Sequence, residues 1–196
     1  MKSLIKGHDG LLRCAWCGDD ELYKAYHDKE WGRPAWDDRS QFEFMVLESA
    51  QAGLSWITIL KKREAYRSAY AGFDPLIVAD WTDSDIERLL NNPLIVRNRK
   101  KIEASIDNAK AFLKISDEYG RFADWLLELM GGRPLVNQWR QMDEIPARTA
   151  LSEKIADEMK TRGFRFFGPV IVYSHLQATG FIDDHLSGCW RSGTKG

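Results

Sequence analysis

The sequence predicts an all-α fold, and three observations support this prediction. Apolar residues recur every three or four positions through most of the chain, which is the spacing of one helix face. Glycines directly follow several of these periodic segments, at the position where helices commonly end. No segment shows a convincing alternation of apolar and polar residues, and there is no internal repeat.

The first long periodic region extends from Gln41 to Tyr70. Apolar residues such as Phe42 and Met45 recur there at helical spacing, and Gly53 interrupts the run. Because glycine weakens a helix interior and readily adopts the turn conformations that end one, the region is expected to form two helices separated at Gly53.

Capping residues and glycines delimit the remaining helices. Thr82, followed three residues later by Asp85, is a variant of the capping box and predicts a helix that continues through Leu90. The other helices are expected at Arg99–Tyr119, Phe122–Met130, Leu151–Arg162 and Pro169–Thr179.

The segment Asn91–Lys101 connects two of these helices through a tight turn, and basic residues begin the second helix. Backbone N–H groups of such a turn and of the following helix N-terminus are suited to contact a DNA phosphate. The glycine-rich turn typical of a helix-hairpin-helix element is absent, however. An ordinary αα-hairpin therefore remains the alternative interpretation.

The composition limits the classes of protein that the chain can represent. At 196 residues it is long enough for one domain, or two closely packed halves, with a sizeable core. The net charge of −1 gives no global signature of nucleic-acid binding, although basic residues cluster at 61–63, 97–101 and 160–165. Neither a signal peptide nor a long apolar span occurs, so we expect a cytoplasmic protein with reduced cysteines and no membrane partner.

Two residues near each end of the chain supply the ligand types of a tetrahedral Cys2His2 zinc site: Cys14, His27, His185 and Cys189. His185 and Cys189 are four residues apart, so a helical turn would place both on one face. One ion bound by all four residues would join the chain ends and have a structural role. Free thiols, a disulfide, or a CxxC pair that includes Cys17 remain alternatives.

Glu48 lies in a stretch otherwise rich in apolar and small residues. Either it faces water, or it lies in a pocket of low polarity where its charge acts on a ligand. On a continuous helix, Gln51 and Ser55 would share its side.

Tyr23 and Tyr26 are three residues apart and lie just before the candidate metal ligand His27. A metal ion bound to His27 would therefore orient a helix that carries two phenols. Aromatic rings beside a carboxylate are suited to a flat, cationic ring. Stacking contributes about 1–3 kcal/mol per base. Two stacks with a charged hydrogen bond would offset the cost of extruding a nucleotide, so a base-flipping site is energetically feasible.

Six separated motifs make the sequence recognisable. They are RCAW at 13–16, YKAYHDKEWG at 23–32, LESAQAGLSW at 47–56, KKREAY at 61–66, RGFRF at 162–166, and DH with GC at 184–185 and 188–189. In this order they closely resemble the DNA 3-methyladenine glycosylase I family. The resemblance covers nearly the whole chain.

The resemblance implies an all-α helix-hairpin-helix DNA glycosylase fold with a zinc clasp that joins the N- and C-terminal segments. Residues 1–196 would form a single domain, with clasped segments near 13–40 and 180–190 and a helical body at 41–179. The implied activity is that of a monofunctional enzyme acting on alkylated double-stranded DNA. It flips out 3-methyladenine and hydrolyses the N-glycosidic bond, which leaves an abasic site and free 3-methyladenine. One structural Zn²⁺ and a monomeric state are also implied.

The resemblance also assigns roles to individual residues. Glu48 matches the carboxylate that recognises the base, and it is the expected catalytic-site residue, without being assigned as nucleophile or general base. The expected substrate-binding residues are Trp16, Tyr23, Tyr26, Trp31 and Trp56. The expected DNA-binding residues are Gly53 and Leu54, which would fill the gap in the duplex, with Arg97 and Lys101 at the hairpin. The expected zinc ligands are Cys14, His27, His185 and Cys189.

Two other classes of function fit these residues less well. A noncatalytic, zinc-stapled nucleic-acid-binding domain would not need the base-recognising residues that are present. A zinc-dependent nucleobase deaminase would need HxE and PCxxC motifs, which are absent, and an open metal position. Cys17 departs from the family pattern, and we hypothesise that the metal takes His27 as a ligand instead of Cys17.

Overall fold

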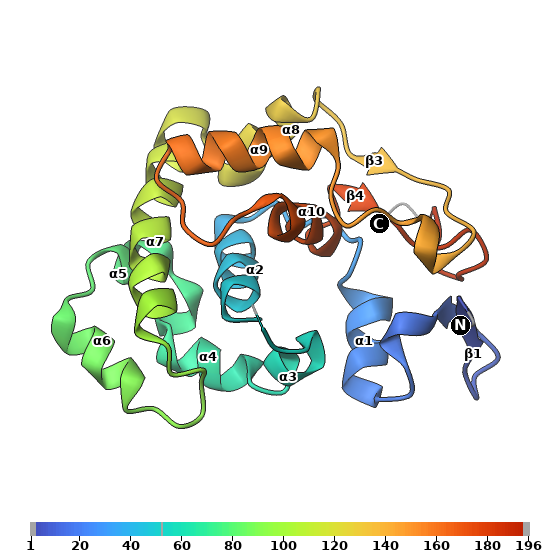
Figure 1. The fold of residues 1–196 in the computed structure, drawn as a ribbon, viewed down its shortest axis with the longest axis horizontal. Helices are drawn as coiled ribbons and strands as arrows, with labels where there is room; N and C mark the ends of the chain where they lie inside the picture. Colours follow the sequence, from blue (N-terminus) through green and yellow to red (C-terminus); the bar gives the residue numbers. More distant parts are fainter. Residues whose placement is uncertain (1–2, 52, 194–196) are drawn as a thin grey trace.

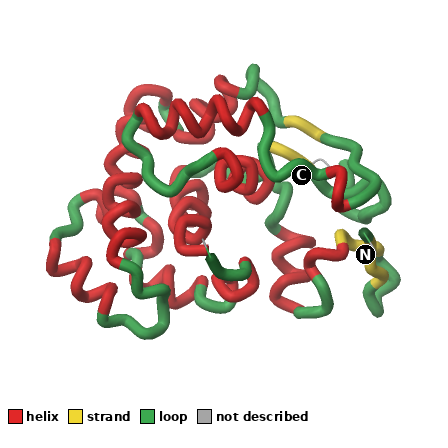
Figure 2. Tube along the Cα trace, viewed as in Figure 1, coloured by secondary structure: helices red, strands yellow, loops and turns green. Residues whose placement is uncertain are grey.

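The computed structural model describes residues 3–51 and 53–193, and helices dominate it (Figures 1 and 2). The chain ends therefore lie outside the described residues. The helices are α1 (Glu21–Lys29), α2 (Asp38–Gln51), α3 (Trp56–Leu60), α4 (Arg63–Ala69), α5 (Pro75–Ala79), α6 (Asp83–Leu90), α7 (Arg99–Tyr119), α8 (Phe122–Leu129), α9 (Ala150–Thr161) and α10 (Pro169–Ala178). The prediction of an all-α fold is therefore confirmed in part, because the described residues are mostly helical.

Short strands were not expected from the sequence, and the described residues contain four of them. β1 (Leu4–Lys6) pairs antiparallel with β2 (Leu12–Cys14), and β3 (Leu135–Val136) pairs parallel with β4 (Ile182–Asp183). Each has only two or three residues. An alternating pattern needs more positions than this to be recognisable, so the sequence carried no signal for them.

The boundaries of α6 to α10 were predicted within one residue, and local capping explains this for α6 and α7. The Thr82–Asp85 capping box begins α6, with the Thr82 backbone N–H donating to the Asp85 carboxylate at 3.0 Å. The Asn98 side chain caps α7, which ends at Gly120 in a left-handed conformation. These signals lie within a few residues of the boundary they determine, so the sequence alone reveals them.

The prediction of two helices between Gln41 and Tyr70 was wrong, because the region contains three. α2 ends before Gly53, whose φ of +86° places it in the left-handed region. A second break follows at the basic residues Lys61 and Lys62, which separate α3 from α4. This break has no glycine or proline to mark it in the sequence.

Helix α2 is the centre of the protein and is surrounded by α4, α7, α8 and α10 (Figure 1). All positions from Gln41 to Ala50 are buried, including the carboxylates of Glu43 and Glu48. Glu43 is paired with Arg63 and Arg67 of α4 at 2.6 and 2.7 Å. A helix buried on every side must satisfy its polar groups through partners on neighbouring helices, and Glu43 does so.

The two ends of the described chain lie on the same side of the molecule as α1 (Figure 1). The Trp190 backbone N–H donates to the Leu12 carbonyl at 2.9 Å, which attaches the C-terminal turn to β2. After α10, Gly180 has a φ of +73°, and a Cβ there would lie 2.1 Å from the Arg33 backbone. The close approach of these two segments therefore requires glycine at this position.

No described helix has both the length and the apolar character needed to cross a membrane.

Candidate active site

A cavity of about 290 Å³ opens between α1, α2, α3 and α10. Its size is near the lower end of the roughly 300–1,000 Å³ typical of small-molecule sites. It brings together Glu48 and all five residues expected to bind the substrate: Trp16, Tyr23, Tyr26, Trp31 and Trp56. Sequence reasoning missed other lining residues, which are Met142, Ile145, Ser174, Gln177 and Ala178.

The aromatic residues form connected walls of this cavity. Trp16 contacts Tyr23 and Trp31 with ring centroids 5.1 and 5.0 Å apart, and Tyr26 contacts Trp56 at 5.6 Å. Burial, with the nearby Glu48 charge, raises the pKa of Tyr26 well above its usual value. The Tyr26 phenol therefore keeps its proton and is available as a hydrogen-bond donor.

Glu48 lies on α2 with only 5% of its surface exposed. Its Oε2 atom is 2.8 Å from Nδ1 of His175, whereas Oε1 has no hydrogen-bond partner within the described part of the chain. Burial raises the pKa of Glu48, and the adjacent His175 imidazole opposes that rise. A buried carboxylate oxygen without a partner, in a residue that lines the cavity, is an unused acceptor for a ligand.

His175 contacts the Glu48 carboxylate on the side away from the cavity, and Gln41 in turn contacts His175; sequence reasoning missed both residues. His175 lies on α10, 127 positions after Glu48, and Gln41 lies two helical turns before Glu48 on α2. Nε2 of His175 is 2.8 Å from Oε1 of Gln41. A histidine within the apolar segment 169–179 was the only available sequence signal, and a buried structural histidine explains that signal equally well.

Ser55 does not share a helix face with Glu48, so that expectation was wrong. The structure places Ser55 in extended backbone at the start of α3, after α2 has ended. Gly53 and Leu54 form the turn between these helices, where the Leu54 N–H donates to the Gln51 carbonyl at 2.7 Å. Leu54 is 40% exposed, and Gln51 and Trp56 on either side of this turn line the cavity.

The segment between α6 and α7 forms a tight connection that exposes Arg97 and Leu94. Lys62 donates to the Leu94 carbonyl at 2.9 Å and so closes the turn. Lys101 donates to the Ala50 carbonyl at the end of α2, also at 2.9 Å. The Lys101 side chain therefore links α7 to the end of α2, next to the turn that carries Leu54.

The four expected metal ligands meet in one buried cluster that joins the two ends of the described chain. Their ligand atoms lie within 4.8 Å of one another: Cys14 Sγ, His27 Nε2, His185 Nδ1 and Cys189 Sγ. Tetrahedral zinc, with bonds of 2.0–2.3 Å, would place its donor atoms about 3.6 Å apart. The sulfur–nitrogen distances of 3.5, 3.6 and 3.9 Å fit this geometry.

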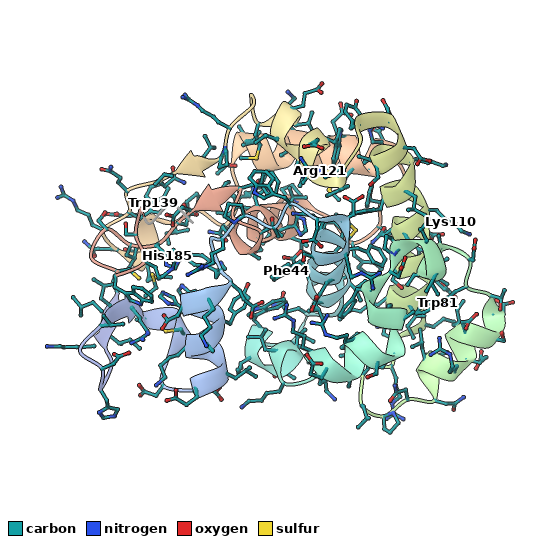
Figure 3. The ribbon with its side chains drawn as sticks, turned by 180° about the vertical axis from the view of Figure 1, so that it is seen from behind. Phe44, Trp81, Lys110, Arg121, Trp139 and His185 are labelled. Atoms are coloured by element: carbon teal, nitrogen blue, oxygen red, sulfur yellow. The ribbon has the colours of Figure 1, made fainter. Side chains whose placement is uncertain are left out.

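His185 and Cys189 do not lie on a helical turn, contrary to expectation. They follow β4 in an irregular turn, in which the Cys189 N–H donates to the Leu186 carbonyl at 2.7 Å. Figure 3 shows His185 near Trp139, on the side of the molecule that carries the terminal segments. This turn brings Nδ1 of His185 and Sγ of Cys189 together, and the four-residue spacing alone does not predict its conformation.

Hydrogen bonds orient both histidine rings toward the centre of the cluster. His27 donates from Nδ1 to Asp28 at 2.7 Å, and His185 donates from Nε2 to the Trp31 carbonyl at 3.1 Å. Each bond leaves the other ring nitrogen with its lone pair facing the cysteines. The rings of Trp31 and His185 are also 4.6 Å apart, which connects the cluster to the cavity wall.

Cys17 is buried but does not belong to this group. Its thiol faces the Gly18 carbonyl, and burial raises its pKa to about 11. The geometry therefore favours His27 over Cys17 as a metal ligand, as hypothesised.

Comparison with known proteins decides the family to which this chain belongs. The family model for methyladenine glycosylase matches residues 16–192. The chain belongs to the methyladenine glycosylase family. Among the family's members, DNA-3-methyladenine glycosylase 1 of Escherichia coli strain K12 is 45% identical over 179 residues, which cover 91% of this chain and 96% of the relative.

Solved structures of this family have the same fold. A crystal structure of a 3-methyladenine DNA glycosylase I is 47% identical, with a TM-score of 0.88, and the match covers 92% of this chain and 99% of the other. A variant of such an enzyme in complex with 3-methyladenine is 39% identical, with a TM-score of 0.90 and coverage of 94% and 99%.

Proposed function

We propose that this chain is a monofunctional DNA glycosylase of base-excision repair. It flips 3-methyladenine out of double-stranded DNA and hydrolyses the N-glycosidic bond, which releases the free base and leaves an abasic site. Membership in the methyladenine glycosylase family and the related structure with bound 3-methyladenine support this reaction. The observation in this chain that carries the proposal is that Glu48, whose Oε1 has no hydrogen-bond partner within the described part of the chain, lines a cavity with aromatic walls.

The proposed mechanism follows from the charge of the substrate. Methylation at N3 makes the adenine cationic, so the base leaves as a neutral molecule and needs little help from a general acid. Glu48 accepts hydrogen bonds from the cationic base through Oε1, while Trp16 and Trp56 stack against it and Tyr26 donates a hydrogen bond. Because Glu48 is buried, these electrostatic interactions are stronger than they would be in solution.

No residue is assigned as the base that activates water. Asp107 follows the hairpin in sequence, at a position that could suggest such a role. Its carboxylate forms an ion pair with Arg165 at 2.7 Å and is 46% exposed, so it is engaged at the surface. We therefore leave Asp107 out of the mechanism, and the oxocarbenium-like sugar is stabilised by the electrostatics of the substrate and of Glu48.

We further propose that Cys14, His27, His185 and Cys189 bind one structural Zn²⁺. The ligand distances and the hydrogen bonds to Asp28 and Trp31 support this proposal. When bound, the ion would act as a clasp that holds the terminal segments against α1 and the cavity wall. With four protein ligands, it keeps no open position for substrate or water, so the reaction itself is carried by the cavity residues.

For DNA binding, we propose that α6, α7 and their connecting turn act as a helix-hairpin-helix element. Exposed Arg97 supports a phosphate contact at this turn. Leu54, beside Gly53, is exposed next to the cavity and is suited to fill the gap that the flipped base leaves. Lys101 orients the two elements through its bond to α2, in addition to any phosphate contact.

We propose that residues 1–196 form a single glycosylase domain and act as a monomer in the cytoplasm. The helical body surrounds α2, and the terminal segments close against it through the candidate metal cluster. One continuous core that includes residues from α2 to β4 supports the single-domain arrangement.

The proposal is tested by incubating the protein with N-methylated duplex DNA and identifying the released bases by chromatography. We expect release of 3-methyladenine. The Glu48→Gln variant should release it about 10- to 100-fold more slowly, because a hydrogen bond to a charged group contributes about 1.5–3 kcal/mol.

Glu158→Gln, the same chemical change at an exposed position of α9, should retain wild-type activity. Affinity for undamaged duplex should be nearly equal in all three proteins. DNA binding without base release by the wild type would overturn the proposal, and so would equal losses of base selection and nonspecific DNA affinity in Glu48→Gln.

A further inference from the structure

The hydrogen bonds behind the cavity determine which His175 nitrogen carries a proton. Nε2 of Gln41 donates to the Ala35 carbonyl at 2.6 Å, so the amide oxygen Oε1 is the atom that faces His175. An amide oxygen is only an acceptor, and His175 must therefore donate to it from Nε2. The Ala35 backbone N–H in turn donates to the Thr179 carbonyl at 3.0 Å, which fixes this loop against the end of α10.

Because the His175 ring already carries a proton on Nε2, a hydrogen bond between Nδ1 of His175 and Oε2 of Glu48 requires one further proton between these two atoms. Without it, two lone pairs would face each other at 2.8 Å, which is repulsive. With it, the contact is a strong hydrogen bond, written either as carboxylate with imidazolium or as carboxylic acid with neutral imidazole. The pair therefore holds one proton as a unit.

We propose that His175, oriented by Gln41, is a positioning residue for base recognition: it engages Oε2 of Glu48 through the shared proton and so directs Oε1 into the cavity. This inference rests on the proposed function, because it assumes that Oε1 accepts hydrogen bonds from the base. His175 itself is absent from the residues that line the cavity, so it acts through Glu48 and does not touch the base.

The surroundings of the pair isolate it from other charges. From α8 and the loop before α10, the neighbours of the His175 ring are aromatic: Phe122 at 6.3 Å and Phe167 at 6.0 Å between ring centroids. From α1, the titratable group that interacts with Glu48 is Tyr26, which stays protonated. His175 is 2% exposed, so water does not compete for the shared proton.

This arrangement predicts a specific pH dependence. As pH rises, the pair loses the shared proton, Nδ1 and Oε2 repel each other, and Oε1 loses its orientation. As pH falls, a second proton enters the pair and Glu48 loses its charge as an acceptor. Activity of the wild type should therefore show two limbs that belong to the coupled pair.

Two substitutions of His175 separate positioning from a purely structural role. His175→Asn places an amide N–H where Nδ1–H was, so it still donates to Glu48 but does not titrate. We expect it to retain base release within about threefold at neutral pH and to lose the alkaline limb. His175→Phe matches the aromatic neighbours but removes the donor.

In His175→Phe the Glu48 carboxyl is buried without its partner, which raises its pKa further. The rate of base release at neutral pH should fall at least about tenfold, because Glu48 is no longer held in its productive position. The rate should rise with pH and should not fall again at alkaline pH. The affinity for free 3-methyladenine, measured at each pH by titrating the base and following tryptophan fluorescence, does not depend on the chemical step. His8→Asn, an exposed histidine, is the matched control and should leave the pH profile unchanged.

If His175→Phe does not fold, histidine-labelled nitrogen NMR of the wild type gives the second measurement. The His175 ring should show a protected, strongly hydrogen-bonded proton that is lost in Glu48→Gln. The inference is overturned if His175→Asn and His175→Phe keep the wild-type pH profile and base affinity, or if the ring signal is unchanged in Glu48→Gln. Those results would leave the proposed function intact, which fails instead if the wild type releases no base.

Discussion

Asp184 is a buried carboxylate on which we base a quantitative stability prediction. It is 0% exposed and lies one residue before a candidate zinc ligand. Its two oxygens accept four side-chain hydrogen bonds, from Asn137 at 2.7 Å, Trp139 at 2.8 Å, Tyr173 at 2.5 Å and Gln177 at 2.6 Å. It therefore holds α10, the segment after β3 and the turn of the metal cluster together.

Asp184→Asn keeps the side-chain shape but converts one acceptor oxygen into an NH₂ donor. If the NH₂ faces Asn137 and Trp139, two N–H donors lose their acceptor; if it faces Tyr173 and Gln177, the Tyr173 hydroxyl can turn and accept from it, and the Gln177 N–H loses its acceptor. Each unsatisfied buried donor costs about 1–3 kcal/mol, so the free energy of unfolding should fall by about 1–6 kcal/mol, with relaxation favouring the lower half. Asp184→Ala removes both acceptor oxygens, and with them all four hydrogen bonds, and should cost more.

The assay is urea unfolding followed by far-UV circular dichroism, with the free energy of unfolding obtained by linear extrapolation. Asp143→Asn, at an exposed position of the short 3-10 helix Met142–Glu144, is the control and should change the free energy of unfolding by less than about 0.5 kcal/mol. If Asp184→Asn is as stable as this control, the conclusion that the Asp184 carboxylate holds α10, the segment after β3 and the turn of the metal cluster together is incorrect.

Two further predictions concern the metal cluster and the cavity rim. His27→Ala should lose bound zinc while Cys17→Ser retains it, measured as zinc per protein by elemental analysis; loss of metal only in Cys17→Ser would show that the ligand set is wrong. Leu54→Ala should weaken binding to a duplex containing an abasic site by about tenfold, since it removes a large apolar group from the gap, while the free energy of unfolding stays within about 0.5 kcal/mol because Leu54 is exposed. Equal affinities of Leu54→Ala and wild type for that duplex would remove Leu54 from the DNA contacts.

Several features of the fold were predictable because their causes are local. The Thr82 capping box and Gly120 lie within a few residues of the helix ends that they determine. The break between α3 and α4 was missed because Lys61 and Lys62 carry no turn signal. Both helices contact α2, but α3 also packs against α1, whereas α4 also packs against the turn at Ala71–Phe73. The strands were missed because each has only two or three residues, too few for side-chain alternation to show, and because β3 and β4 come from segments far apart in the sequence.

For the site, the sequence by itself identified the chemical groups: four residues of zinc-ligand type, a carboxylate in an apolar helix, and a set of aromatic residues, whose combined order resembles one family. Only the tertiary structure decided that these groups meet. Residue types indicate which chemical groups are present, and their spacing indicates local secondary structure. A contact between α2 and α10 depends on how the helices pack, which the spacing does not indicate. For that reason the His175–Glu48 pair and its Gln41 anchor, which connect positions more than a hundred residues apart, became visible only in the folded chain.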